Sequence, residues 1–352
     1  MSIQSPVSGW FCIVLRTGSM NFDRFRIALR LATIAGIASL LAMPLPGPGP
    51  QAGPLGDFNV LAFGDFSAPS SDVEGRLYAG GNVSLNSYSV GDKLQGGLAG
   101  GDTLVVGGDL SFTSGAVYHG NVRVGGSAAG VGSGVRWGLI NNGYALTDTL
   151  GAAGLPVDFA AEQARLSTFS AGLAALGVTG TSNYKWSQLF LTGDGTAGRQ
   201  VFSVSAADLG AATNVVVQDI AEGAEVIVNV TGASASMSGG LDAFFERNRD
   251  SVLFNFVDAE TLNLANIGVQ GSILAVDADI TTGWGVVWGQ VVADSWSGPM
   301  QVNQVYFDGT PPSPPVEPDD VAVAEPGVLA IFVLGLAGLG FARRARRSRQ
   351  AV

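Results

Sequence analysis

The chain has 352 residues, of which 47% are hydrophobic and 51 are glycine, and its formal net charge is −11. This apolar content excludes an intrinsically disordered chain, and the absence of a Gly-X-Y period excludes collagen. Between Gly53 and Ala324, nine Lys and Arg residues stand against 27 Asp and Glu residues, a net of −18. Because so acidic a body repels phosphate, nucleic acid is excluded as a partner.

Residues 1–52 predict export. Met20 begins a basic segment that is followed by the apolar run Leu31 to Met43. This pattern is typical of a secretory signal peptide and is too short for a stable membrane span. We therefore expect synthesis to start at Met20 and cleavage to fall near Ala52, with a permanent N-terminal anchor as the alternative. The single cysteine, Cys12, precedes Met20, so the mature body has no disulfide and no thiol nucleophile.

A repeated phrase organises the first half of the body. It reads Leu77-Tyr-Ala-Gly-Gly-Asn-Val, then Leu104-Val-Val-Gly-Gly-Asp-Leu, then Val122-Arg-Val-Gly-Gly-Ser-Ala, at steps of 27 and 18 residues. Each phrase predicts a short strand that ends in a glycine pair, where a turn with positive φ costs little.

A helix is predicted over residues 156–177. Phe159, Leu166, Phe169, Leu173 and Leu176 follow the helical period and form one apolar stripe. Asp158 is the expected N-cap and Gly177 the expected stop signal. Because one stripe alone is apolar, we expect this helix to pack along the outside of the β body.

The second half again predicts short strands. They begin at Val226, Val252, Gly271 and Gly289, and the last two are 18 residues apart. Short strands spaced by one coil length predict a mainly β protein, a right-handed β-helix (solenoid) with one flanking amphipathic helix. A β-sandwich is the alternative, because short strands punctuated by turns also fit that fold.

The C-terminal residues predict a sorting signal. Residues 310–324 form a Pro-rich spacer, and residues 325–352 contain the apolar run Gly327 to Ala342 and an arginine-rich tail. With the Glu325-Pro326 pair, this arrangement resembles the PEP-CTERM signal, although Ala324 replaces the first proline of that motif. The resemblance implies an exosortase-type processing enzyme and transient insertion of the C-terminal helix in the inner membrane. A plain membrane anchor is the alternative.

The body itself resembles the choice-of-anchor A domain. The resemblance rests on Leu55-Gly-Asp-Phe-Asn-Val-Leu-Ala-Phe-Gly-Asp-Phe, on the phrase around Gly80, and on Asn255 in the Val-Leu-Phe-Asn-Phe strand. It covers about Leu55 to Phe307, within a body that we place at residues 53–309. The resemblance implies an adhesive domain, with collagen binding in some relatives, and a β-helix-plus-helix layout similar to that of ice-binding proteins. It implies no particular binding residue.

Catalysis finds little support in the sequence. His119 is the only histidine, and no Gly-x-Ser-x-Gly elbow lies in the body. The Gly193–Gly198 segment matches a dinucleotide fingerprint in letters, but a predicted strand follows it instead of the required helix. We interpret it as a hairpin turn. A polysaccharide-active β-helix enzyme is therefore a minor alternative, and the protein is predicted not to be an enzyme.

Two groups of residues are candidate binding sites. Calcium takes carboxylate oxygens, and Asp72 and Glu74 are the first candidates for such a site; no other cofactor is expected. Trp284, Trp288 and Trp296 are candidate ligand contacts, because a flat ring offers a large contact area at small entropic cost. The alternative for these tryptophans is a hydrophobic end cap of the solenoid.

Together these features predict a non-catalytic adhesin at the cell surface or in the extracellular matrix. Its expected partner is an extracellular polysaccharide or a matrix protein. An ice-binding-like function is the alternative from another class, although the repeat strands quoted above contain no ladder of threonines. A purely structural envelope protein is the third reading.

Overall fold

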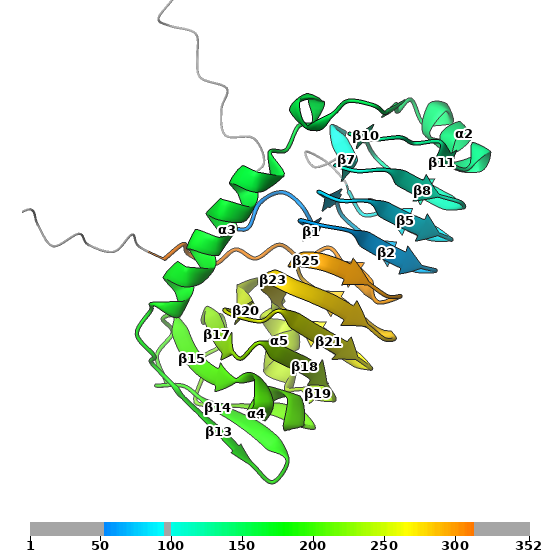
Figure 1. The fold of residues 1–352 in the computed structure, drawn as a ribbon. Coiled ribbons are helices and arrows are strands. Elements are labelled where there is room, and N and C mark those ends of the chain that lie inside the picture. The colour runs from blue at the N-terminus through cyan, green and yellow to red at the C-terminus, as the bar shows by residue number, and fades with distance from the viewer. Residues whose placement is uncertain (1–52, 95–99, 313–352) are drawn as a thin grey trace, which may run out of the picture. The chain divides into compact units, whose positions relative to one another are not determined.

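The computed structural model describes residues 53–94 and 100–312, all of which belong to one compact unit. Strands of three faces succeed one another along the chain, and almost all their pairings are parallel (Figure 1). This is a β-helix, so the predicted solenoid is confirmed and the β-sandwich is not formed. The predicted signal peptide, most of the Pro-rich spacer and the sorting signal at Glu325 and Pro326 lie outside the described residues.

The first face takes one strand from each coil. In order along the stack it contains β12 (Leu146–Thr147), β10 (Asn121–Val124), β7 (Asp102–Val106), β4 (Leu77–Ala79), β1 (Val60–Ala62), the start of β25 (Val291–Ser297), the start of β23 (Ser272–Thr282), β20 (Val252–Phe256), β17 (Val226–Thr231) and β15 (Gln200–Ser205).

The second face takes the next strand of each coil. It contains β11 (Gly130–Val131), β8 (Leu110–Phe112), β5 (Val83–Asn86), β2 (Phe66–Pro69), the ends of β25 and β23, β21 (Thr261–Ala265) and β18 (Ser234–Ser238). On these strands buried and exposed residues alternate, as in the pattern of β2 and β5. The buried residues fill the interior, and the exposed ones form a continuous outer surface.

Two smaller sheets complete the third face. The first contains β9 (Gly115–Val117), β6 (Tyr88–Val90), β3 (Asp72–Val73), β26 (Gln301–Asn303), β24 (Gly285–Trp288) and β22 (Ile267–Gln270). The second contains β19 (Gly240–Leu241), β16 (Asn214–Gln218), β14 (Gln188–Thr192) and β13 (Thr181–Lys185). Its strand β19 contacts β22 of the first sheet. Among the strands of the described residues, β13 and β14 are the only two that pair in antiparallel fashion.

The coils do not follow chain order along the stack. The first coils are added outward from β1 to β10, and α2 (Ser133–Asn141) follows at that end. The chain then continues through α3 (Phe159–Ala174) to the opposite end, and its later coils build back toward β1. The last coil closes the stack, because Val60 of β1 pairs with Val291 of β25. Short helices α4 (Ala206–Ala211) and α5 (Ala243–Arg247) and the 3-10 turns η4 (Ala152–Gly154) and η5 (Arg249–Ser251) lie in the connections.

The repeated glycine pairs form the corner between the first and second faces. Glycine is required there for a reason other than the positive φ that the sequence analysis proposed. None of these glycines has positive φ. Instead, a Cβ on Gly107 would lie 2.0 Å from the carbonyl oxygen of Gly80, and one on Gly108 would lie 2.5 Å from Oδ1 of Asn82. The predicted turn is thus correct, but close stacking of coils excludes the side chain.

A ladder of side-chain oxygens explains the Asn and the Asp that follow the first two glycine pairs. The Asn82 amide donates to Oδ1 of Asp65, the Asp109 amide to Oδ1 of Asn82, and the Ser127 amide to Oδ1 of Asp109. Each coil thereby satisfies a backbone donor of the next one. The repeat steps of 27 and 18 residues are the register steps from Leu77 to Leu104 and from Leu104 to Val122.

Helix α3 covers the first face, as predicted. Leu166, Phe169 and Leu173 are buried against outward residues of that face, and Phe159 and Leu176 are partly buried beside them. Asp158 caps the helix through a hydrogen bond from the Ala161 amide at 3.1 Å. The helix ends at Ala174 with Ala175 as C-cap, so Gly177 lies two positions beyond the cap, one residue further than the position expected of a stop signal. No helix among residues 53–94 and 100–312 is long and apolar enough to cross a membrane.

The Gly193–Gly198 segment connects β14 to β15. A strand does follow it, as predicted, but β14 and β15 belong to different sheets. The segment is therefore a corner between two faces, and the predicted hairpin was wrong.

Candidate ligand-binding face

Hydroxyl and amide side chains form an unbroken row along the outer surface of the second face. The strand register aligns one residue from each of seven neighbouring strands into what we call the hydroxyl row: Ser236, Asn263, Thr281, Ser297, Ser67, Ser84 and Ser111. Parallel strands lie about 4.8 Å apart, so six steps extend over roughly 29 Å. All these side chains are uncharged and can both donate and accept hydrogen bonds.

A second, shorter row lies beside the first. It contains Ser234, Thr261, Asp279 and Ser295, one from each of four neighbouring strands. Members of the two rows bond to their neighbours in the same row: Ser234 Oγ to Thr261 Oγ1 at 2.9 Å, and Asn263 Nδ2 to Thr281 Oγ1 at 3.0 Å. These bonds orient the four side chains that make them before any ligand arrives, which lowers the entropic cost of binding there.

The face has a depression where the two rows lie side by side. A shallow depression of about 540 Å³ is lined by Ser234, Ser236, Thr261, Asn263, Asp279 and Thr281. Such a volume accepts part of an extended polymer, and its walls offer hydrogen-bonding groups with a single carboxylate. The surface is thus suited to a neutral, hydroxyl-rich ligand.

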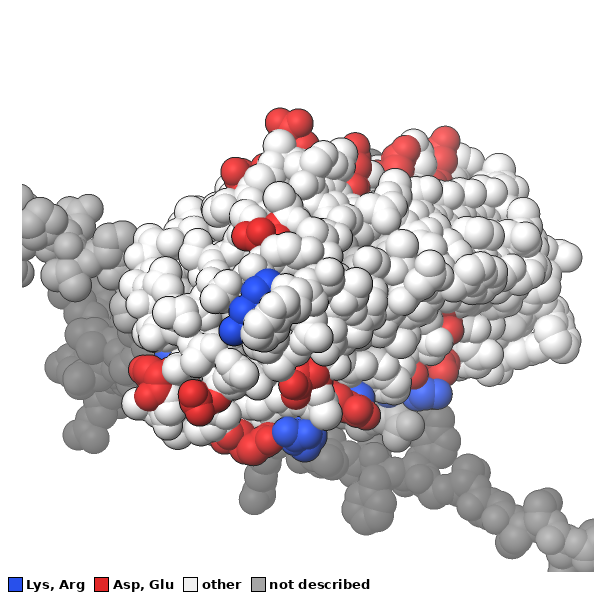
Figure 2. Space-filling view, turned by 90° about the horizontal axis from the view of Figure 1, so that it is seen from below, with Lys and Arg blue, Asp and Glu red and all other residues white. Residues whose placement is uncertain are grey.

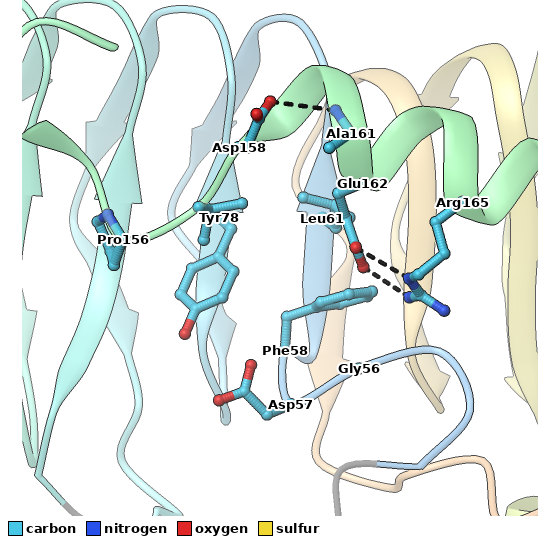
Figure 3. A pocket seen from close by; sticks show the side chains of 11 residues that line it. Gly56, Asp57, Phe58, Leu61, Tyr78, Pro156, Asp158, Ala161, Glu162 and Arg165 are labelled. Carbon is cyan, nitrogen blue, oxygen red and sulfur yellow. Dashed lines mark hydrogen bonds and ion pairs between the residues drawn. The ribbon is translucent and has the colours of Figure 1, made fainter. Parts of the chain in front are cut away.

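A separate pocket lies under the start of α3 (Figure 3). It has a volume of about 410 Å³, and its floor is formed by Phe58, Leu61 and Tyr78. Glu162 and Arg165 close one side through an ion pair of 2.6 Å, and Arg165 also donates to the backbone carbonyl of Leu55 at 2.7 Å. Burial raises the pKa of Tyr78 far above its usual range, so its hydroxyl stays protonated. Because Arg165 of α3 donates to the backbone carbonyls of both Pro54 and Leu55, the side chains at this pocket help to hold α3 in place.

The three predicted tryptophans have three different environments. Trp296 is 1% exposed and stacks on Phe66 in the interior at 6.0 Å between ring centroids, so as a ligand contact it was wrong. It also lies in the coil that pairs with the first coil, and so it is not an end cap. Trp288 is partly buried, with the Arg249 guanidinium 4.4 Å from its ring centroid. Trp284 is 69% exposed and stays a candidate contact.

The calcium candidates lie at the start of the third face. The Gln301 side-chain amide donates to Asp72 at 3.2 Å, and the Gln304 backbone amide donates to Glu74 at 2.8 Å. Burial, then the carboxylates of Asp92 and Glu74, raise the pKa of Asp72. Within the described part of the chain, no three His, Cys, Asp or Glu residues are grouped to hold a metal. Calcium at Asp72 and Glu74 stays a prediction.

Sequence reasoning missed the hydroxyl row. The signal was present three residues beyond the glycine pairs, in Gly80-Gly-Asn-Val-Ser84 and Gly107-Gly-Asp-Leu-Ser111. The polar residue there follows a buried one, which is the alternation of a half-buried strand. The quoted strands before the glycine pairs belong to the first face, so their lack of a threonine ladder did not bear on the second face.

Replacing Asp294 by asparagine is expected to stabilise the body at neutral pH. Burial, then the carboxylates of Asp279 and Asp277, raise the pKa of Asp294. A raised pKa means that the folded state disfavours the charged form, so the cost is present at neutral pH and disappears as the pH falls through the folded pKa. Urea unfolding should show a gain of about 0.5 kcal/mol at pH 7 and none at pH 3. An equal gain at both pH values would contradict this electrostatic origin.

Comparison with known proteins shows the family to which the chain belongs. No curated protein matches the chain. Among solved structures, it is similar to an ice-binding protein from the Antarctic ascomycete Antarctomyces psychrotrophicus, at 14% identity and a TM-score of 0.29, over 73% of this chain and 97% of that one. The family model described as "Putative Ice-binding-like adhesive domain" matches residues 51–304. The chain therefore belongs to this family of ice-binding-like adhesive domains.

Proposed function

We propose that the body is a non-catalytic adhesive domain whose second face binds an extended extracellular polysaccharide. The hydroxyl row is the observation that supports this best, because it presents the same hydrogen-bonding chemistry at each coil step. A polysaccharide chain repeats hydroxyl groups in the same way. Each hydrogen bond contributes only about 1 kcal/mol, so the affinity comes from many contacts made at once on a rigid surface.

The location that fits this function is the outside of the cell. We propose that the segment after Met20 directs export and that the Glu325-Pro326 region directs sorting by an exosortase-type enzyme, after transient insertion in the inner membrane. The finer resemblance to the choice-of-anchor A domain agrees with such a role. The family membership of the body supports a surface function independently of either end.

A bulky substitution in the middle of the hydroxyl row tests the proposal. Ser67→Tyr combined with Ser297→Tyr places two rings on neighbouring strands of the row. We expect retention of the full-length protein on the exopolysaccharide of the producing cell to fall at least about tenfold, since several hydrogen bonds are lost together. Thr168→Tyr, on the exposed side of α3, is the matched control and should leave retention unchanged. Unchanged retention of the double variant would exclude this face.

Ice binding is the second candidate, because the same uncharged row is a regular surface and the family description names ice-binding-like domains. A thermal-hysteresis measurement on the wild-type protein and on the double tyrosine variant separates the two. Hysteresis that disappears in the variant, together with unchanged polysaccharide retention, would assign the row to ice.

A further inference from the structure

The hairpin formed by β13 and β14 lies at the end of the coil stack that is opposite α2 (Figure 1). β13 is the outermost strand of its sheet, and four of its five residues are exposed. Figure 2, which views the molecule from below in the frame of Figure 1, shows most acidic side chains along the upper and lower margins, with few charged side chains between them.

Trp186 projects from the turn of this hairpin. It is 81% exposed, more than any other large hydrophobic residue among those described. Both turn residues, Trp186 and Ser187, have left-handed backbone with φ of 52° and 59°. Two-residue turns of this kind normally use Asn-Gly, because a larger side chain there is strained. The chain thus keeps a large aromatic ring in solvent, in an unfavourable backbone conformation.

The hairpin is fastened to the body on both sides of the ring. The Tyr184 hydroxyl donates to the carbonyl of Ala211 at 3.3 Å, and the Ser182 hydroxyl donates to that of Ser203 at 2.6 Å. Leu189 and Leu191 of β14 are buried in the core. The ring is therefore presented from a fixed support.

Lys185, beside the tryptophan, is the one described cation held only by aromatic rings. Its Nζ lies 4.6 Å from the ring centroid of Phe190 and 5.0 Å from that of Trp186. Of the nine Lys and Arg residues in the described part, seven form an ion pair with a carboxylate: Arg76, Lys93, Arg123, Arg165, Arg199, Arg247 and Arg249. Arg136 donates to backbone carbonyls instead. The charge of Lys185 is therefore available to an anion.

We propose that this hairpin is a second binding site, which takes an anionic pyranose such as a uronate unit of an acidic polysaccharide. The open side of the Trp186 ring stacks on the apolar face of the sugar, and the Lys185 ammonium pairs with its carboxylate. The acidic body repels such a polymer elsewhere, so binding is confined to this end and is sensitive to salt. The site uses strands other than those of the hydroxyl row and does not rest on the function proposed for that row.

The test compares binding of the full-length protein to polygalacturonate and to its neutral methyl ester, by retardation in affinity gel electrophoresis. Trp186→Asn removes the ring with a residue that suits left-handed backbone, so folding is preserved. We expect it to weaken binding to both polymers at least tenfold. Lys185→Met should weaken binding to polygalacturonate at least fivefold and leave binding to the ester unchanged.

Two controls keep the proposal falsifiable. Trp137 on α2 is 70% exposed at the other end of the stack, so Trp137→Ala should not change the retardation. The Ser67→Tyr, Ser297→Tyr variant should also bind polygalacturonate normally. Wild-type retardation of Trp186→Asn would overturn the site. So would a wild-type dimer in size-exclusion chromatography that Trp186→Asn converts to a monomer, because the hairpin would then bind a second copy of the chain.

Discussion

Replacing Gly107 by alanine is expected to destabilise the body by at least about 3 kcal/mol, or to prevent its folding. The added Cβ would lie 2.0 Å from the carbonyl oxygen of Gly80 and 2.7 Å from its carbonyl carbon. Both atoms are backbone of the residue that directly follows β4, and β4 is paired with β7, so neither atom can move without disturbing the stack. Urea denaturation followed by circular dichroism measures the loss.

The matched control is Gly138→Ala. Gly138 lies inside α2, where an added Cβ meets nothing within 4 Å. Alanine is the better helix former, so this variant should be more stable by about 0.5–1 kcal/mol. If Gly107→Ala were within about 1 kcal/mol of the wild type, the close stacking of the glycine corners would be wrong.

Replacing Asn255 by leucine is expected to cost about 3 kcal/mol and to loosen α3. Asn255 is fully buried on β20, and its Nδ2 donates to Asn229 Oδ1 at 2.8 Å and to the carbonyl of Ser170 at 3.0 Å. Its Oδ1 accepts from the Ser170 hydroxyl at 2.6 Å, and Asn229 reaches the carbonyl of Leu173 at 3.0 Å. Leucine would leave the buried Ser170 hydroxyl and Oδ1 of Asn229 without the hydrogen bonds that Asn255 makes with them.

Two further variants test whether the cost of Asn255→Leu comes from its hydrogen bonds and not simply from replacing asparagine by leucine. Asn263→Leu, at an exposed position of β21, should change the free energy of unfolding by less than about 0.5 kcal/mol. Ser170→Ala combined with Asn255→Leu should cost less than the sum of the single variants, because both remove the same bond. Additive costs would show that α3 is not fastened by this network. Limited proteolysis near residues 174–180 provides a second measure of the attachment.

Local features of the fold could be predicted from the sequence, since they depend on short patterns. The strands after Val226 and Val252 are where the apolar runs place them, and the stripe of α3 faces the sheet. The order of the coils could not be predicted in this way. Many strands share the same apolar pattern, so nothing local shows that β25 pairs with β1.

The candidate sites were less accessible to sequence reasoning. A tryptophan is found both in cores and at binding surfaces, so the sequence could not show that Trp296 is buried and Trp284 is exposed. Trp186 gave no signal, because its exposure depends on left-handed backbone at a turn with no glycine. The hydroxyl row became visible only when the register aligned serines that are far apart along the chain.

The pairing of the last coil with the first also sets an order of folding. Val60 and Val291 are joined across almost the entire body, so the contact closes one of the longest loops that the chain can form. During synthesis the coils from β1 to β10 can stack early, while the free edge of β1 stays unpaired until β25, in the last coil, has been made. Unpaired edges of this kind promote aggregation. A nascent chain that stalls before residue 291 therefore exposes an unprotected parallel edge, and its completion removes that hazard in one step.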